Sequence, residues 1–317
     1  MQTRFRSLAV NSGQFDGVSN FETLALVDSN NVNIDNSLIG EDFTTVEFAL
    51  TDDGAGAAGL TVDITEMANG SAANVTSANI LDETAGQNAD DNAAGLHALT
   101  SVDLSLADAT GDTDELTFRM KNTQDDEGLL ENIEDFSDVN GTFTVTTLTM
   151  DGVETVNIDS SGTTGANTVA TLDASNATAV NLTGDQDLNI GALTTDAATA
   201  GDAITVDAST MTGDAAVDLD IDGDYDHTVT GTANNDRFTF DDADTFNNDD
   251  VINGGEGTDT LEIANQDGDL GAIRANGIET VQLEVEATQN TAAVEHNLDL
   301  RDVSDLSSLI VDVNSAD

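Results

Sequence analysis

The segment from Gly254 to Leu261 places three glycines and an aspartate at a spacing suited to binding a metal ion. The glycines are Gly254, Gly255 and Gly257, and Asp259 lies two positions before the apolar Leu261. Glycine lets the backbone turn with a positive φ, which exposes carbonyl oxygens, and Asp259 adds a carboxylate oxygen. Oxygen donors without nearby histidine or cysteine favour Ca²⁺ over a transition metal. The segment therefore predicts a calcium-binding turn followed by a strand.

Two further aspartates extend the predicted site upstream. The segment Gly231–Phe238 holds Asp236 where the first segment holds Asp259, again two positions before an apolar residue. Asp250 lies nine positions before Asp259, as in a repeat of nine residues. Stacked turns of a solenoid would bring such carboxylates around one ion. We therefore predict Asp236, Asp250 and Asp259 as ligands, together with carbonyl groups of the turn 254–257.

A second acidic stretch, Asp218–Asp224, matches the start of an EF-hand loop. Its twelfth position is Val229, however, where that loop requires glutamate. Leu219 and Ile221 also alternate with the aspartates as in a half-buried strand. We interpret this stretch as the acidic face of a strand that ends in a turn, and such a face could still bind calcium weakly.

The charge of the chain limits its partners. Among 317 residues, 62 are acidic and 7 are lysine or arginine, which gives a formal net charge of -55. Such self-repulsion opposes compaction and must be offset by bound cations or high salt. It argues against nucleic acid and anionic membranes, which require clustered positive charge. No apolar run reaches the length of a transmembrane segment, and no cleavable export signal is visible.

Catalytic patterns are lacking in the sequence. The three histidines, His97, His227 and His296, show no metal-ligand spacing, and no nucleophile elbow or phosphate-binding loop occurs. There is no cysteine, which excludes disulfides and thiolate sites. The chain also has no proline, which suits regular strands whose N–H groups all pair. We expect a protein that is not an enzyme.

Short alternating strands separated by Gly/Asp/Asn turns recur along the chain, which indicates half-buried strands. The clearest are 60–64, 102–106, 143–145, 156–158, 180–182 and 188–190. A phrase also repeats: Gly152–Ile158 (GVETVNI) is echoed by Gly277–Leu283 (GIETVQL) and more loosely by Asn20–Leu26 (NFETLAL). We expect each copy to begin a stack of coils, with its glutamate at the turn. Helix is expected only within Glu66–Leu99, at Met67–Ile80 and Asp91–Leu99.

The sequence thus predicts an all-β fold, a parallel β-helix or β-roll solenoid with calcium-binding turns and a few short helices. We divide it into a β-rich N-terminal domain with short helices (1–140), a β-solenoid (141–227), the calcium-binding turns (228–270) and a C-terminal strand segment (271–317).

Several of these segments resemble known proteins. Gly254–Leu261 resembles the repeats of RTX proteins. Together with 152–158, DASNATAVNLTG at 173–184 and GTANNDRF at 231–238, it is similar to bacterial surface-layer proteins of the RTX type. The resemblance covers most of residues 140–290. It implies type I secretion, calcium-triggered folding outside the cell and assembly into a lattice, with ligand roles carried over to Asp236, Gly254, Gly255, Gly257 and Asp259. RTX toxins carry long tandem arrays, whereas this chain has one perfect repeat, which favours scattered ions.

The leading hypothesis is an extracellular structural protein that assembles with itself into a calcium-dependent layer on the cell surface. A cell-surface glycan or lipopolysaccharide is a further candidate partner. One alternative is an RTX-like adhesin or a calcium-stabilised binding module of a larger secreted protein. Another is a soluble protein of a halophile, whose acidity only retains water and salt.

Overall fold

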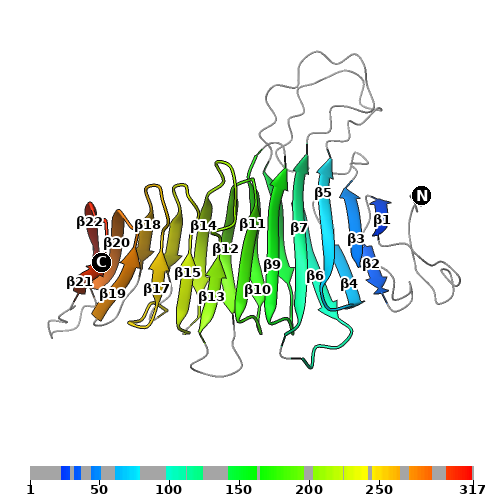
Figure 1. The fold of residues 1–317 in the computed structure, drawn as a ribbon, viewed down its shortest axis with the longest axis horizontal. Coiled ribbons are helices and arrows are strands. Elements are labelled where there is room, and N and C mark those ends of the chain that lie inside the picture. The colour runs from blue at the N-terminus through cyan, green and yellow to red at the C-terminus, as the bar shows by residue number, and fades with distance from the viewer. Residues whose placement is uncertain are drawn as a thin grey trace, which may run out of the picture.

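The chain forms two long parallel β-sheets in the computed structural model (Figure 1). The structure describes residues 23–28, 32–36, 44–50, 61–78, 98–111, 113–123, 142–162, 165–195, 203–223, 225–241, 245–264, 271–287 and 298–315. Over these ranges, strands alternate between the sheets, so each pair of consecutive strands makes one coil. Each sheet has 11 strands among the described residues. The prediction of an all-β parallel solenoid is confirmed.

The first sheet contains the odd-numbered strands in chain order, β1 (Thr23–Asp28), β3 (Thr45–Leu50), β5 (Ser71–Ala78), β7 (Glu115–Thr123), β9 (Thr155–Gly162), β11 (Ala179–Gly184), β13 (Ile204–Asp207), β15 (His227–Thr230), β17 (Val251–Asn253), β19 (Gly271–Asn276) and β21 (Leu298–Val303). The second sheet contains the even-numbered strands, β2 (Val32–Asp35), β4 (Thr61–Met67), β6 (Ala98–Leu106), β8 (Phe143–Thr149), β10 (Asn167–Ala174), β12 (Leu188–Thr195), β14 (Val217–Asp222), β16 (Arg237–Phe240), β18 (Thr260–Ile263), β20 (Thr280–Ala287) and β22 (Ser308–Ser315).

The core is a set of columns of mostly aliphatic side chains that run along the stack, with phenylalanines such as Phe118 and Phe238 among them. One column joins Val156, Val180, Val206, Val229 and Ile252 through the registers of β9, β11, β13, β15 and β17. All five side chains are fully buried. Their neighbours along each strand face outward, because side chains alternate across a strand. A core of thin aliphatic layers explains how the chain folds with few aromatic residues.

The predicted helix at Met67–Ile80 is wrong. This segment holds the end of β4, a turn and β5. Ala73 and Val75 are buried with the half-buried Asn74 between them, which is the period of a strand. Pairing with β3 and β7 overrides the helical preference of an alanine-rich segment. Most of the second predicted helix, Asp91–Leu99, lies outside the described residues, and its last two residues begin β6.

The sheets run through all three expected domain boundaries. β7 pairs with β9 across residue 140, β14 pairs with β16 across residue 228, and β17 pairs with β19 across residue 270. The described ranges contain no α-helix. They therefore contain no helix that is long and apolar enough to cross a membrane. Within these ranges, polar groups lie on the outer faces of the sheets and in the turns that begin the strands, and a few, such as Ser160 and Thr195, are buried inside strands.

Candidate functional site

Three carboxylates form a row at the turns that lead into the second sheet. Asp236 precedes β16, Asp259 precedes β18 and Glu279 precedes β20, and each accepts a backbone N–H from the preceding coil. The N–H of Val217 donates to Asp236 Oδ1 (2.8 Å), that of Asp236 to Asp259 Oδ1 (2.8 Å) and that of Asp259 to Glu279 Oε2 (2.7 Å). This carboxylate row (Asp236, Asp259, Glu279) thus ties four successive coils together.

Asp236 and Asp259 are buried, and burial raises the pKa of both carboxyl groups. Asp236 is 2% exposed and also accepts the N–H (2.6 Å) and the hydroxyl of Thr232. Desolvation raises the pKa of Asp236, although its hydrogen bonds oppose the shift. Asp259 is fully buried, and desolvation, with the charges of Asp236 and Glu279, raises its pKa to about 6. Asp236 and Asp259 therefore place two carboxylates on successive coils where water screens their charge little.

The raised pKa of Asp259 predicts how stability depends on pH. Because the folded pKa lies above that of the unfolded chain, the folded state binds more protons between pH 4 and about 6. Without divalent cations, this residue should therefore destabilise the fold progressively as pH rises through that window. In chelator, the melting temperature of Asp259→Asn relative to that of the unchanged chain should rise between pH 4.5 and pH 7.5. A gap that does not change with pH would contradict the assignment, and Asp214→Asn, at an exposed turn, is the control.

The glycines of the predicted site permit close contact between coils. A Cβ on Gly254 would lie 2.0 Å from the carbonyl oxygen of Gly277 and 2.4 Å from Asp259 Oδ2. Gly255 has φ +106°, and its Cβ would lie 1.9 Å from the carbonyl oxygen of Thr232. Gly257 has φ +125°, and its Cβ would meet the coil below in the same way. The pattern of three glycines therefore has a packing cause that operates with or without an ion.

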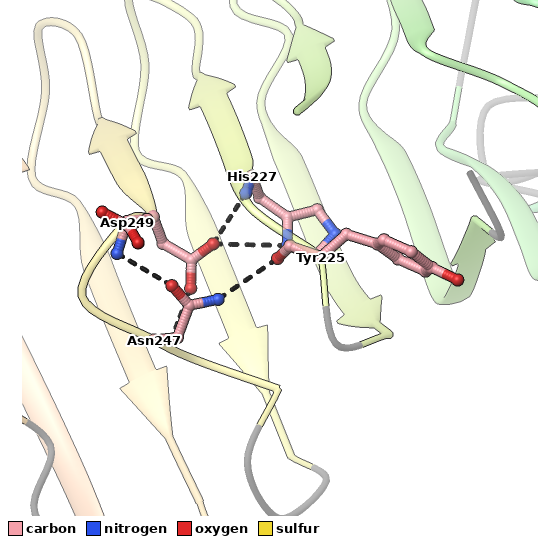
Figure 2. A network of polar contacts seen from close by, with 5 residues as sticks. Tyr225, His227, Asn247 and Asp249 are labelled. Atoms are coloured by element: carbon pink, nitrogen blue, oxygen red, sulfur yellow. Dashed lines mark hydrogen bonds and ion pairs between the residues drawn. The ribbon is translucent and has the colours of Figure 1, made fainter. Parts of the chain in front are cut away.

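Asp250 belongs to a different network, at the turn before β17 of the first sheet, with His227 and Asn247, which Figure 2 labels. It precedes β17 and accepts the N–H groups of His227 (2.7 Å) and Asn247 (2.6 Å). The His227 ring lies beside it, with Nδ1 3.4 Å from Asp250 Oδ1, and both side chains are fully buried. The ring also packs edge-on against Phe240, at 6.0 Å between centroids. Asp250 therefore anchors the start of β15 from the following coil.

The structure brings only part of the predicted ligand set together. Asp236 and Asp259 lie on successive coils, 23 positions apart in the chain. The interpretation of Asp250 and Asp259 as one register of nine residues is wrong, because Asp250 leads into the first sheet and Asp259 into the second. All three carboxylates accept backbone N–H groups, and Asp259 Oδ2 is a buried oxygen with no hydrogen-bond partner among the described residues. Calcium binding by these residues stays a prediction.

A second acidic group lies on the outer face of the second sheet. Asp220 and Asp222 are on β14, and Asp241 directly follows β16. One carboxylate oxygen of each lies within 4.8 Å of the others, so this aspartate cluster (Asp220, Asp222, Asp241) could hold a metal ion. Asp220 and Asp222 are half-buried and Asp241 is exposed, which leaves an open side for water or a further ligand. Three oxygen donors in an open site fit a hard cation.

The sequence indicated two members of this cluster and missed the third. Asp220 and Asp222 fall in the stretch interpreted as an acidic strand face, and β14 confirms that strand. Asp241 escaped notice because it lies 19 positions beyond Asp222. The pairing of β14 with β16, with Asp220 opposite Thr239, brings Asp241 level with Asp222. Only knowledge of this register could have linked them.

The repeated phrase also has a function that its sequence did not reveal. Glu154 Oε2 accepts the N–H of Asp114 (2.8 Å), as Glu279 accepts that of Asp259. Both glutamates lie one residue before a strand and reach back to the preceding coil.

Comparisons with protein-family models, curated proteins and solved structures gave no match.

Proposed function

We propose that this chain is an extracellular structural protein that assembles with itself into a calcium-dependent surface layer. The aspartate cluster, set on a rigid solenoid of net charge -55, is the observation that carries the proposal. Asp220, Asp222 and Asp241 would hold the ion through carboxylate oxygens, and the ion would supply positive charge that the chain lacks. Where calcium is scarce, repulsion keeps the chain expanded, and where it is plentiful, the cation permits compact stacking.

The energy of such binding is large on the scale of protein stability. An extracellular type of site has a Kd of about 10⁻⁴ M. Calcium at about 10 mM would then contribute about 2.7 kcal/mol for each site that exists only in the folded state. A few sites on this scale would match the whole stability of an ordinary domain. Bridging of acidic surfaces on adjacent molecules by further ions would join the molecules into a layer.

Calcium titration by calorimetry tests this proposal. We expect binding heat from the unchanged chain and the loss of one class of site in the double variant Asp222→Asn/Asp241→Asn. Excess chelator should lower the melting temperature and the scattering of assembled material. Asp214→Asn removes an exposed aspartate elsewhere and should bind as the unchanged chain does. Absence of binding heat, or full replacement of calcium by concentrated KCl, would contradict the proposal and favour the halophile alternative.

A groove on the first sheet favours the second candidate, an RTX-like adhesin or binding module. Its cavity volume is about 350 Å³, and its lining includes Arg274 and Arg301 beside the apolar Val251 and Val303. Arg274 and Arg301 are two of the seven lysine and arginine residues in the chain. Arg301 is paired with Asp299, Arg274 lies 3.9 Å from Asp249, and Asp302 also lines the groove. Mixed charges beside apolar side chains suit a polar sugar, such as those of a cell-surface glycan or lipopolysaccharide. This candidate predicts a calcium-stabilised monomer, which electron microscopy after calcium addition would distinguish from sheets.

A further inference from the structure

The outer face of the second sheet carries almost no charge over three of its middle strands. On β8, β10 and β12 the half-buried and exposed side chains are threonine, asparagine, alanine and glycine, and Asp173 is the one charged residue among them. Thr144 pairs in register with Thr168, and Thr147 with Thr171, so hydroxyl groups form rows across the strands. We call this surface the neutral face (the outward side chains of β8, β10 and β12).

The charge of the whole chain limits what can cover the neutral face. At a net charge of -55, two copies repel one another wherever their acidic side chains meet. They can approach closely where threonine meets threonine, because each hydroxyl group both donates and accepts hydrogen bonds. A surface that complements itself is what a two-fold contact between identical molecules requires. The neutral face therefore favours a second copy of this chain over a charged partner.

Acidic strands lie on both sides of the neutral face. Asp103 of β6 pairs in register with Thr149 of β8, and Asp222 of β14 pairs with Thr194 of β12. Asp173 of β10 pairs with both threonines. The three aspartates thus form one acidic row across the sheet (Asp103, Asp173, Asp222), with a threonine between each two.

A two-fold axis along β10 would bring two such rows together. β10 is the middle strand in the order β6-β8-β10-β12-β14 (Figure 1), so β6 of one copy would face β14 of the other. Asp103 would then lie opposite Asp222 of the second copy, and Asp173 opposite its own counterpart. Sheets packed face to face lie about 10 Å apart, and calcium binds carboxylate oxygens at about 2.4 Å. A calcium ion therefore fits between facing aspartates that would otherwise repel one another.

The aspartate cluster lacks ligands that a second copy would add. Asp220, Asp222 and Asp241 offer one oxygen each, whereas calcium takes about six to eight oxygen ligands. The cluster is open at the exposed Asp241, on the outer side of the sheet. Asp103 of a second copy would approach Asp222 from this side. Its carboxylate, together with water molecules, would bring the ion closer to full coordination.

We propose that a second copy of this chain docks on the neutral face, and that Asp103 of each copy completes the calcium site at the aspartate cluster of the other. Such a contact is isologous and closes on a pair of molecules, so pairs are the units from which the layer is built. The inference rests on the calcium site of the proposed function and names the surface and the residue that couple calcium to association.

An engineered cysteine tests the symmetry, because the chain has no cysteine of its own. Thr171 lies on β10, so the axis would place it near its own counterpart. Thr171→Cys should give a covalent dimer with a short bismaleimide in calcium and stay monomeric in chelator. Thr228→Cys, on the outer face of β15 in the first sheet, is the control and should stay monomeric. No dimer of Thr171→Cys in calcium, or a dimer of Thr228→Cys alone, would overturn the inference.

A charge on the neutral face provides a second readout. Thr168→Glu should weaken association in calcium roughly tenfold or more, as measured by sedimentation, because like charges would face one another across the contact. Thr228→Glu makes the same change on the first sheet and should associate as the unchanged chain does. Melting temperatures of both variants report on folding. Equal association of two folded variants would overturn the inference.

Asp103→Asn separates this inference from the proposed function. Calorimetry should show a roughly tenfold weaker calcium affinity for Asp103→Asn, and sedimentation should show a matching loss of dimer, whereas Asp214→Asn should leave both unchanged. Calcium binding that is the same in Asp103→Asn and in the unchanged chain would overturn this inference and leave the calcium site standing. Absence of binding heat from the unchanged chain would instead refute the calcium site itself.

Discussion

Gly255→Ala is expected to lower the free energy of unfolding by about 2–5 kcal/mol. The φ of +106° at this residue costs any L side chain about 1–2 kcal/mol. The added Cβ would also lie 1.9 Å from the carbonyl oxygen of Thr232, a backbone atom that moves only if the coils separate. Forcing such a contact in a packed interior costs about 1–3 kcal/mol more. Urea denaturation followed by circular dichroism would measure the loss.

Gly70→Ala is the matched control for this prediction. Gly70 also has a positive φ (+81°), but a Cβ there would meet nothing within 4 Å. Gly70→Ala should therefore lower the free energy of unfolding only by the backbone cost of about 1–2 kcal/mol. If the two variants were equally stable, the close approach of the coils at Gly255 would be refuted, and the glycine would have to be explained by its φ alone.

Asp236→Ala is expected to lower the free energy of unfolding by about 2–6 kcal/mol. The substitution leaves the N–H groups of Val217 and Thr232 buried without their acceptor, together with the hydroxyl of Thr232. Each buried donor without a partner costs about 1–3 kcal/mol. Removal of a buried charge offsets part of the loss. The midpoint of urea denaturation in chelator would measure the net effect.

Two variants separate hydrogen bonding from charge at this position. Asp236→Asn keeps one acceptor oxygen and removes the charge, so it should lose less stability than Asp236→Ala. Asp214→Ala removes an exposed aspartate and should change stability by less than about 0.5 kcal/mol. A greater loss of stability from Asp236→Asn than from Asp236→Ala, seen only when calcium is present, would contradict this prediction. In that case Asp236 would act mainly as a metal ligand, and the explanation by hydrogen bonding would be wrong.

The fold was predictable because each strand carries its own signal. Alternation at 156–158 and 180–182 identified β9 and β11, and the scarcity of aromatic residues pointed to thin layers. The helix expected at Met67–Ile80 failed because alanine is favourable in a helix and also small enough for the interior of a solenoid. Local preference cannot tell these apart, since pairing with neighbouring coils decides the outcome.

The site was less predictable because its residues meet across coils of unequal length. Asp222 and Asp241 are 19 positions apart, whereas Asp236 and Asp259 are 23 apart, so no fixed period connects them. The aspartates of the glycine-rich segments were predicted as calcium ligands, and the structure shows that they accept backbone N–H groups. Their contacts with backbone N–H groups could not be foreseen, because a carboxylate at a turn has the same sequence signal whether it accepts hydrogen bonds or binds a cation.

The alternation of strands between two sheets also determines how the molecule responds to changes in its length. Each strand pairs only with the strands of the adjacent coils, so no contact in either sheet depends on the total number of coils. Stability then accumulates as a sum over neighbouring interfaces. Gain or loss of a whole coil leaves the remaining interfaces as they were, so evolution can adjust the span of this rod by duplication without redesigning its interior.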